Sequence, residues 1–282
     1  MNTLIIGSGF GLYGYLPSAF KFSKKIYLNN KYEKIIKKRK NLKGYLNKII
    51  WYLDINSIVN QIDYIIIAQK PKHQHAIVFK ILNLIKPKHF FLEKPISNNP
   101  KNSLKLIKIL NKKKVTFSVG YIFKYLSWYK FIEKNLTKKK KFTINWEIKI
   151  NKKNNLWKYN ISEGGGLIRF YAIHLIRLLF DLNITKLKKK IIKKNKIYFY
   201  FSDKLKNDFY INVRLSKSNK FTVTYNDEVY YKGYSPFLKK INKNNDPRVN
   251  VINNYINDIF KNYKTNYIYE KNFILFWKKL EK

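Results

Sequence analysis

The first part of the chain alternates short apolar runs with amphipathic segments. Residues 1–6, 24–30, 62–69 and 89–95 form apolar runs with the length and the β-branched residues of strands. Residues 16–23, 32–44 and 75–85 have helical spacing, and Gly44 marks the end of the second of these helices. Apart from Asp63 and Gln69, the run 62–69 is continuously apolar, which is typical of a strand buried on both faces. Strands that alternate with helices in this way predict a doubly wound parallel sheet.

The pattern changes after about residue 120. Residues 142–150, 196–202, 208–216 and 220–233 alternate apolar and polar positions, and polar turns rich in Asn and Lys separate them. This alternation predicts an antiparallel sheet with one covered face and one wetter face. Residues 249–260 and 272–282 have helical spacing, and we expect these C-terminal helices to pack back on the body. The sequence therefore predicts an α/β domain of residues 1–120, followed by an α+β domain of residues 121–282 with a mostly antiparallel sheet.

A glycine-rich loop follows the first apolar run directly. Gly7, Gly9 and Gly11 stand where a tight turn and the close approach of a pyrophosphate need residues without a side chain. The N-terminus of the helix that follows favours this anion. In the pattern G-x-G-x-x-G the third glycine falls on Leu12, so either Gly11 or a different approach of the helix must compensate. The loop predicts that residues 1–120 form a dinucleotide-binding Rossmann domain.

The second predicted strand ends without the acid that would bind the adenosine ribose of NAD. The chain offers Asn29, Asn30 and Lys31 at this place. A missing carboxylate and an available lysine favour NADP over NAD, although either coenzyme remains compatible with the sequence.

Composition narrows the class of protein. The chain has 282 residues, a formal charge of +43 and no cysteine, which excludes disulfides and thiolate metal sites. The charge would favour nucleic-acid binding, but Lys, Asn, Ile, Tyr and Phe are all abundant, a skew that an AT-rich genome imposes on solvated positions. We interpret basic runs such as 138–141 and 188–190 as surface or turns. With no membrane-spanning run and no secretory signal, we expect a cytoplasmic protein with no membrane partner and do not expect nucleic acid as its main partner.

Two further motifs follow predicted strands of the first domain. Pro71 and His75 come just after the strand at 62–69, and Glu93 and Lys94 come at the end of the strand at 89–95. Ligands bind at the carboxyl ends of parallel strands in such sheets. On the residues alone, the Glu–Lys pair is either a rim salt bridge or part of a site. A third motif, Gly164 to Gly166 before an apolar helical run with His174, is equally compatible with a hydrogen-bonded core histidine.

Taken together, these motifs resemble the Gfo/Idh/MocA family of NAD(P)-dependent oxidoreductases. The resemblance rests on GSGFGLYGYLPSA, AQKPKHQH, FLEKPIS, VGYIFKY and EGGGLIRFYAIH, which occur in the order of the family and cover about residues 1–180. It implies a Rossmann domain followed by a sheet domain, and a sugar-like small molecule as substrate. It also implies coenzyme contacts from the following residues: Gly7, Gly9, Phe10, Gly11, Asn29, Pro71, His75, Glu93 and Lys94.

The resemblance makes Lys94 the active-site lysine and His174 the active-site histidine. An ammonium group near the nicotinamide stabilises the developing charge on the reacting oxygen, and an imidazole serves as acid, as base or as the group that orients the substrate hydroxyl. The open sheet face of the second domain also invites a homo-oligomer.

One departure from the family concerns the aspartate that commonly precedes the histidine by one helical turn. Here Phe170 stands at that position, and a phenyl ring cannot carry a proton. Either Lys94 and His174 suffice, with Tyr121 or Tyr171 supplying a hydroxyl, or the chain binds the dinucleotide without catalysis. Arg169 and Arg177 would bind an acidic substrate, or else lie on a solvated helix face.

Other residues receive simpler interpretations. Tyr121, Trp157, Arg169 and Tyr171 are the candidates for substrate binding, with Trp157 just before the glycine turn. We expect His73 and His89 to lie on the surface or in loops. No third ligand follows at a useful spacing, so we predict no metal site.

Overall fold

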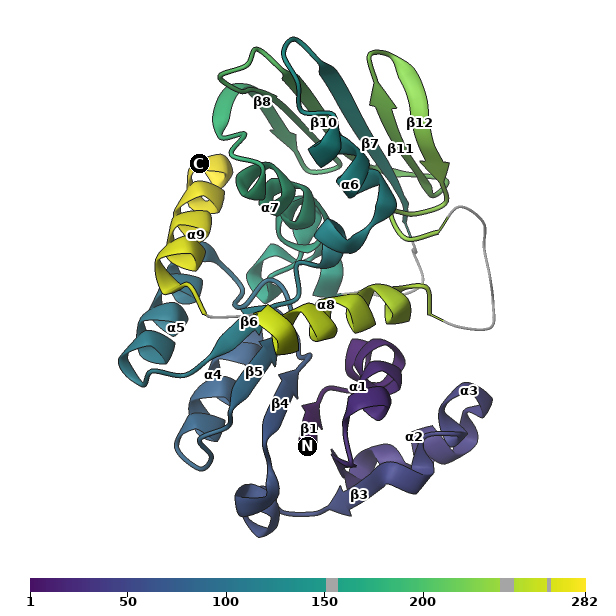
Figure 1. Ribbon diagram of the computed structural model, residues 1–282, viewed down its shortest axis with the longest axis vertical. Coiled ribbons are helices and arrows are strands. Elements are labelled where there is room, and N and C mark those ends of the chain that lie inside the picture. The colour runs from purple at the N-terminus through teal and green to yellow at the C-terminus, as the bar shows by residue number, and fades with distance from the viewer. Residues whose placement is uncertain (151–156, 239–245, 263–264) are drawn as a thin grey trace. The chain divides into compact units, whose positions relative to one another are not determined.

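The computed structural model describes residues 1–150, 157–238, 246–262 and 265–282, and the chain divides into two compact units (Figure 1). The first unit comprises residues 1–120 and 243–271, and the second comprises residues 121–242 and 272–282. The sequence placed all of 121–282 in the second domain, whereas the structure groups 243–271 with the first unit. No helix among the described residues is long and apolar enough to span a bilayer.

The first unit contains a six-stranded parallel sheet. Its strands are β1 (Asn2–Ile6), β2 (Lys25–Asn29), β3 (Ile49–Tyr52), β4 (Tyr64–Ile67), β5 (His89–Leu92) and β6 (Phe117–Val119). They pair in the order β3-β2-β1-β4-β5-β6, which is the Rossmann order. Ile65, Ile66 and Ile67 of β4 are fully buried, as a strand covered on both faces requires. The predicted fold class of this part is confirmed.

The helices of the first unit differ from the prediction in three places, one of which is a helix at Pro100–Lys112 that the sequence reading did not predict. They are α1 (Leu16–Phe22), α2 (Glu33–Lys38), α3 (Lys40–Lys43), α4 (Pro71–Leu82), α5 (Pro100–Lys112) and α8 (Arg248–Asn262). The single helix expected at 32–44 is broken, because Arg39 has extended backbone angles (φ −101°, ψ 113°) and divides it into α2 and α3. Helix α4 begins at Pro71 rather than at His75, since proline fits the first turn of a helix.

The second unit contains a six-stranded sheet that is mostly antiparallel, as predicted. Its strands are β7 (Lys141–Lys149), β8 (Lys186–Lys193), β9 (Lys196–Ser202), β10 (Asp208–Ser216), β11 (Lys220–Tyr225) and β12 (Glu228–Gly233). They pair in the order β12-β11-β7-β10-β9-β8, and only β7 and β10 are parallel. Asn226 and Asp227 connect β11 to β12, and both have a positive φ, as a tight hairpin turn requires.

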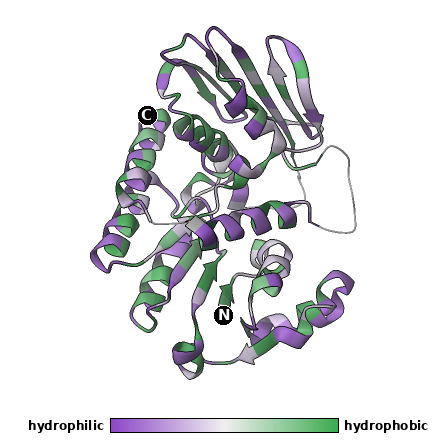
Figure 2. Ribbon diagram, viewed as in Figure 1, coloured by the Kyte–Doolittle hydropathy of each residue, from purple (hydrophilic) through white to green (hydrophobic). Residues whose placement is uncertain are grey.

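One face of this sheet is covered. Trp128 of α6 (Ser127–Lys134) packs on Phe221 of β11 with ring centroids 5.1 Å apart. Phe276, at the end of α9 (Tyr267–Glu281), lies 6.1 Å from Phe201 of β9. Helix α7 (Ile173–Asp181) is hydrophobic over most of its length, as the green ribbon in Figure 2 shows, and Ile173 is fully buried.

The basic run 188–190 was interpreted as surface or a turn, and the second alternative is wrong. These residues lie in β8, the edge strand of the second sheet, and are largely exposed. Lysine side chains on an edge strand remain solvated and oppose pairing with another strand, so the composition is compatible with this position.

Candidate functional site

The glycine-rich segment after β1 has one position that excludes a side chain and one where a side chain would have to displace a neighbouring ring. Gly7 has φ +151°, and a Cβ atom there would lie 2.3 Å from the carbonyl oxygen of Ala68, after β4. A Cβ atom on Gly14 would lie 2.1 Å from the ring of Phe10. Gly11 has ordinary space around it, with the nearest side-chain atom at 3.5 Å. The sequence analysis identified Gly7 and missed Gly14. Gly14 follows Gly11 by three residues in the segment GLYG, so it could have been recognised as a further glycine of the loop.

The pattern mismatch at Leu12 is resolved by the approach of the helix and not by Gly11. Leu12 is fully buried, and residues Gly11–Tyr15 form a π-helical turn that leads into α1. The amide N–H groups of Leu12 and Tyr13 both donate to the carbonyl oxygen of Gly9, at 3.0 and 3.2 Å. This wide first turn lets the chain leave β1 with a bulky residue where the family pattern has glycine.

The surroundings of the loop fit a dinucleotide. No heavy atom lies within 4 Å of a Cβ atom built on Gly9, so this face of the loop leaves room for a phosphate. Two buried polar atoms of α4, Gln74 Oε1 and His75 Nε2, have no hydrogen-bond partner among the described residues. Buried polar groups are normally satisfied, so these atoms favour a polar ligand at this edge of the sheet.

The end of β2 carries an amide in place of a carboxylate. Asn29 caps the short helical turn at Asn30–Tyr32, and its Oδ1 accepts from the backbone N–H of Lys31 at 3.2 Å. This bond fixes the path of Lys31, whose ammonium lies 5.1 Å from the ring centroid of Tyr32. The local charge is therefore positive where an NAD-specific site would have an acid.

Glu93 and Lys94 follow β5 at the carboxyl edge of the sheet. Lys94 is only 8% exposed. The Tyr15 hydroxyl donates to Glu93 Oε2 at 3.1 Å, and the side-chain amide of Gln74 donates to the Glu93 carbonyl at 2.6 Å. Burial raises the pKa of Glu93, while the positive charges of Lys94 and Arg248 oppose this shift. Tyr15 and Gln74 lie within the motifs GSGFGLYGYLPSA and AQKPKHQH, but the sequence reading assigned no role to either residue.

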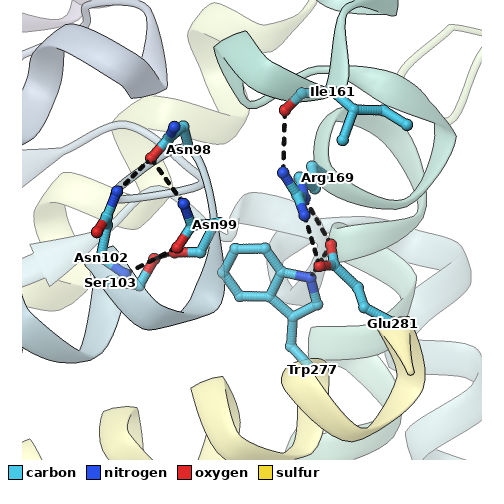
Figure 3. A network of polar contacts seen from close by, with 8 residues as sticks. All are labelled: Asn98, Asn99, Asn102, Ser103, Ile161, Arg169, Trp277 and Glu281. Carbon is cyan, nitrogen blue, oxygen red and sulfur yellow. Dashed lines mark hydrogen bonds and ion pairs between the residues drawn. The ribbon is translucent and has the colours of Figure 1, made fainter.

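The loop after Lys94 is fixed to the first turn of α5. Asn98 Oδ1 accepts from the side-chain amides of Asn99 and Asn102 at 3.2 and 2.9 Å. Asn99 caps the helix through the backbone N–H of Asn102 at 2.9 Å, and its carbonyl accepts from the hydroxyl of Ser103 at 2.8 Å (Figure 3). These bonds hold the segment that carries Lys94 in one conformation.

A residue from the far end of the chain covers the glycine loop. The Arg248 guanidinium lies 4.0 Å from the ring centroid of Phe10, and it forms a two-point ion pair with Asp246 at 2.8 and 2.5 Å. The hydroxyl of Ser18 in α1 donates to the Val249 carbonyl at 3.3 Å. The start of α8 therefore completes the surroundings of Phe10, a predicted coenzyme contact.

In the second unit, the three glycines form the turn that begins the helix of His174. Gly164 and Gly166 have φ values of +88° and +87°. A Cβ atom on Gly165 would lie 2.2 Å from the Trp157 carbonyl oxygen. A π-helical turn at Leu167–Ala172 follows and leads into α7. Every glycine of the motif is therefore required by the backbone.

His174 lies within an aromatic cluster. Its side chain is 6% exposed, and the imidazole stacks on Phe123 with centroids 4.3 Å apart and planes 6° apart. The ring of Tyr121 meets it edge-on at 6.4 Å. At the position of the expected acid, Phe170 contacts Trp157 at 5.2 Å and Tyr171 at 4.8 Å. The residue at that position therefore packs against aromatic rings and carries no titratable group.

Neither arginine of this segment lies on a solvated helix face, so that alternative is wrong. Arg169 donates to both carboxylate oxygens of Glu281 at 2.7 and 2.8 Å and to the Ile161 carbonyl at 2.9 Å (Figure 3). Trp277 Nε1 donates to the same carboxylate at 2.9 Å. Arg177 pairs with Asp181 at 2.6 Å, and its guanidinium carbon lies 4.9 Å from the ring centroid of Tyr121. Both guanidinium groups are therefore paired with carboxylates of the chain itself.

His89 was expected on the surface, and this prediction is wrong. His89 is the first residue of β5 and is 6% exposed, and its Nε2 lies 2.9 Å from the Ser118 hydroxyl. It begins a run of buried aromatic residues, which the sequence reading joined to the strand without placing the histidine inside. His73 lies on the exposed side of α4, as expected. Among the described residues no three His, Cys, Asp or Glu side chains form a metal-binding group.

Comparison with known proteins places the first unit. Residues 1–121 match the model of GFO_IDH_MocA, described as an oxidoreductase family with an NAD-binding Rossmann fold. The match covers less than half of the chain, and it confirms the resemblance for the motifs that lie within these residues. No curated protein matches the chain.

Solved structures share the fold of the whole chain. A dehydrogenase (MviM) from Clostridium difficile has 18% identity and a TM-score of 0.70, with 100% of this chain and 98% of that chain covered. The WlbA dehydrogenase from Thermus thermophilus, in complex with NAD and UDP-GlcNAcA, has 10% identity and a TM-score of 0.70, with coverage of 100% and 95%. A super-repressor mutant of Gal80p from Saccharomyces cerevisiae has 12% identity and a TM-score of 0.69, with coverage of 100% and 95%. At these identities the likeness establishes the fold alone.

Proposed function

We propose that the protein is an NAD(P)-dependent oxidoreductase that interconverts an alcohol and a ketone on a sugar or sugar derivative. The observation that carries the proposal is the free face of Gly9, at the carboxyl edge of a family-type Rossmann sheet that also presents the buried Lys94. The nicotinamide, when bound, would supply or accept the hydride. The complex of the WlbA dehydrogenase with NAD and a nucleotide sugar supports the substrate class.

The residues have separate roles in this proposal. The glycine loop with Phe10, together with Asn29, Pro71, His75 and Glu93, binds the dinucleotide. Lys94 donates a hydrogen bond to the reacting oxygen and stabilises negative charge on it. The Tyr15–Glu93 bond and the Gln74 contact hold the backbone that carries this lysine.

His174 is proposed to exchange the proton of the substrate hydroxyl, as acid in one direction and as base in the other. Its stacking on Phe123 fixes the plane of the imidazole. Tyr121, Trp157 and Tyr171 are proposed to contact the substrate. Arg169 is excluded from this set, because Glu281 already holds its guanidinium.

NADP is the preferred coenzyme in this proposal. Asn29 and Lys31 offer no carboxylate to the adenosine 2′-hydroxyl and place a positive charge near the 2′-phosphate that NADP carries. The expected result is a lower Kd for NADPH than for NADH, with Lys31→Glu reversing the order. Equal affinities in the unaltered protein would contradict this preference.

A second candidate is a dinucleotide-binding protein without catalysis. Phe170 favours it, because the cluster with Trp157 and Tyr171 leaves an aromatic ring where family members commonly have an acid. The fold occurs in a mutant of the repressor Gal80p as well as in dehydrogenases.

The first test of the proposal measures the affinity of the protein for NADPH, with NADPH fluorescence as the readout. Gly9→Val is expected to abolish binding without unfolding the protein, since the new side chain would enter the space for a phosphate. Gly11→Ala is the matched control, because this position accommodates a Cβ atom. Unchanged NADPH affinity in Gly9→Val would overturn the proposed site.

Turnover with a panel of keto-sugars separates the two candidates. Lys94→Met and His174→Gln are expected to lower kcat at least 100-fold while NADPH binding by His174→Gln is retained, as loss of general acid–base catalysis predicts. NADPH binding without turnover of any keto-sugar would support the second candidate.

A further inference from the structure

The second unit contains a cavity of about 290 Å³, whose described lining includes one predicted substrate contact, Tyr171. It lies at the end of β7, on the side of the sheet that carries the turn before α7. Its lining residues are Trp146, Ile148, Lys149, Lys158, Tyr159, Tyr171, Asn219, Tyr234 and Ser235. This volume lies just below the range of about 300–1,000 Å³ that is usual for ligand pockets, so the cavity suits a single sugar ring and not a whole nucleotide sugar.

Aromatic side chains form much of the wall. Trp146 and Tyr171 meet edge to face with centroids 5.5 Å apart. The C–H face of a sugar ring is apolar and packs on such rings, while hydroxyl and amide groups bind its oxygens. Burial, and to a lesser degree the charge and the hydrogen bond of the neighbouring Tyr159, raise the pKa of Tyr171, so its hydroxyl stays protonated and bonds to Tyr159. The wall is therefore suited to a sugar.

The rim of the cavity is fixed by hydrogen bonds. Asn219 Oδ1 accepts from the backbone N–H of Lys149 at 2.8 Å, and its side-chain amide donates to the Tyr234 hydroxyl at 2.5 Å. A single asparagine thus connects a lysine from β7 with an aromatic residue that follows β12. A rim held in this way needs little rearrangement when a ligand binds.

The charge of the lining has one sign. Lys149 and Lys158 both line the cavity, and none of its described lining residues is acidic. The ammonium of Lys158 lies 5.5 Å from the ring centroid of Phe170, the residue at the position of the family aspartate. Arg169 and Arg177 pair with Glu281 and Asp181 and do not line the cavity, whereas Lys149 and Lys158 are the cations among its described lining residues.

The cavity also lies one aromatic layer from His174. Trp146, in its wall, is 5.9 Å from Phe123, and Phe123 stacks on the imidazole at 4.3 Å. A substituent held in the cavity would therefore be remote from the reacting carbon, and binding energy from such remote groups positions a substrate for reaction.

We propose that this cavity binds a monosaccharide unit that carries a carboxylate or a phosphate group, with the anion between Lys149 and Lys158 and the ring on Trp146 and Tyr171. The inference rests on the proposed function for its connection to catalysis, but binding to the cavity can be measured without turnover.

The experiment is calorimetric titration of the full chain with D-glucuronate, D-glucose 1-phosphate, D-glucose and inorganic phosphate, at 0.15 M salt to screen non-specific attraction. At least one of the anionic sugars is expected to bind ten times or more tightly than glucose and than inorganic phosphate. Carboxylate and phosphate sources are distinguished by which of the two anionic sugars binds. Lys158→Gln and Lys149→Gln are each expected to remove most of this preference. Lys232→Gln is the control: it removes one exposed charge from β12, outside the cavity lining, and should leave the preference unchanged.

Equal binding of glucose and of both anionic sugars would overturn the inference. The same holds if inorganic phosphate competes as well as a sugar phosphate, or if Lys232→Gln weakens binding as much as Lys158→Gln, because both results indicate general attraction to a basic protein. NADPH binding is measured in the same samples. Retained NADPH binding without preference for an anionic sugar contradicts only this inference, whereas the reverse result contradicts only the proposed coenzyme site.

Discussion

The buried His89 predicts a specific loss of stability in weak acid. Burial lowers the pKa of His89 from 6.5 to about 3. Its Nε2 lies 2.9 Å from Ser118 Oγ, which in turn accepts from the Tyr255 hydroxyl at 2.6 Å. The serine proton is therefore available to the imidazole, which accepts it only in the neutral form.

The sign follows from the two pKa values. Above about pH 6.5 His89 is neutral in the folded and the unfolded chain, and it contributes no pH dependence. As the pH falls from 6.5 towards 3, the unfolded chain binds a proton that the folded chain does not, so the free energy of unfolding decreases. With about 1.36 kcal/mol per pH unit, the loss is about 0.8 kcal/mol at pH 6 and about 2 kcal/mol at pH 5.

The assay compares urea unfolding at pH 7.5 and pH 5, followed by circular dichroism, in the unaltered protein and in His89→Gln. The variant loses stability at pH 7.5, but its free energy of unfolding is expected to fall by about 2 kcal/mol less on acidification. His73→Gln is the matched control, since His73 is exposed on α4 and its removal should leave the pH dependence unchanged. If the two pH dependences differ by less than about 0.5 kcal/mol, His89 is not a buried neutral group and the reasoning fails.

Further predictions concern the glycine loop, an ion pair and assembly. Gly14→Ala is expected to lower the free energy of unfolding by about 1–3 kcal/mol in urea, because its methyl group overlaps the Phe10 ring; unchanged stability would contradict the overlap. Arg169→Met is expected to cost about 2–3 kcal/mol in thermal unfolding, and a double variant that also replaces Glu281 with Met should recover part of this loss. A second copy of the chain is expected on the polar face of the second sheet, so sedimentation should show a dimer that Tyr210→Lys dissociates; a monomeric unaltered protein would refute this.

The sequence predicted elements where periodicity was strong. The alternating run 208–216 is strand β10, and the continuous apolar run within 62–69 contains strand β4. It failed where an element is short or where charge obscures the pattern. Strands β3 and β6 have four and three residues, too few for alternation to appear. Strand β8 is rich in lysine, and its position at the edge of the sheet became evident only from the pairing with β9.

Prediction of the site was limited in a different way. Motifs locate residues that act through their own backbone, such as Gly7, and those next to a strand end, such as Lys94. Contacts between distant segments leave no local sequence pattern. The contact of the Arg248 guanidinium with the Phe10 ring therefore could not be predicted from the spacing of residues. Arginine is scarce in this lysine-rich chain, and its presence at a position could have been used to predict an ion pair. Four arginines form an ion pair with an acid in the structure: Arg169, Arg177, Arg214 and Arg248.

The family match ends at residue 121, but the first unit also includes helix α8. Ile252, Tyr255 and Ile256 are at most 3% exposed, so the helix contributes to the core of the first unit. Its start contacts the glycine loop through Arg248, while the Tyr255 hydroxyl donates to Ser118 of β6, which also contacts His89. One helix therefore supports both the proposed phosphate-binding loop and the buried polar group whose titration limits stability in acid. Because these contacts share one helix, a substitution at the start of α8 is expected to disturb the loop through packing, so the proposed coenzyme site would depend on residues more than 100 positions beyond the Rossmann strands.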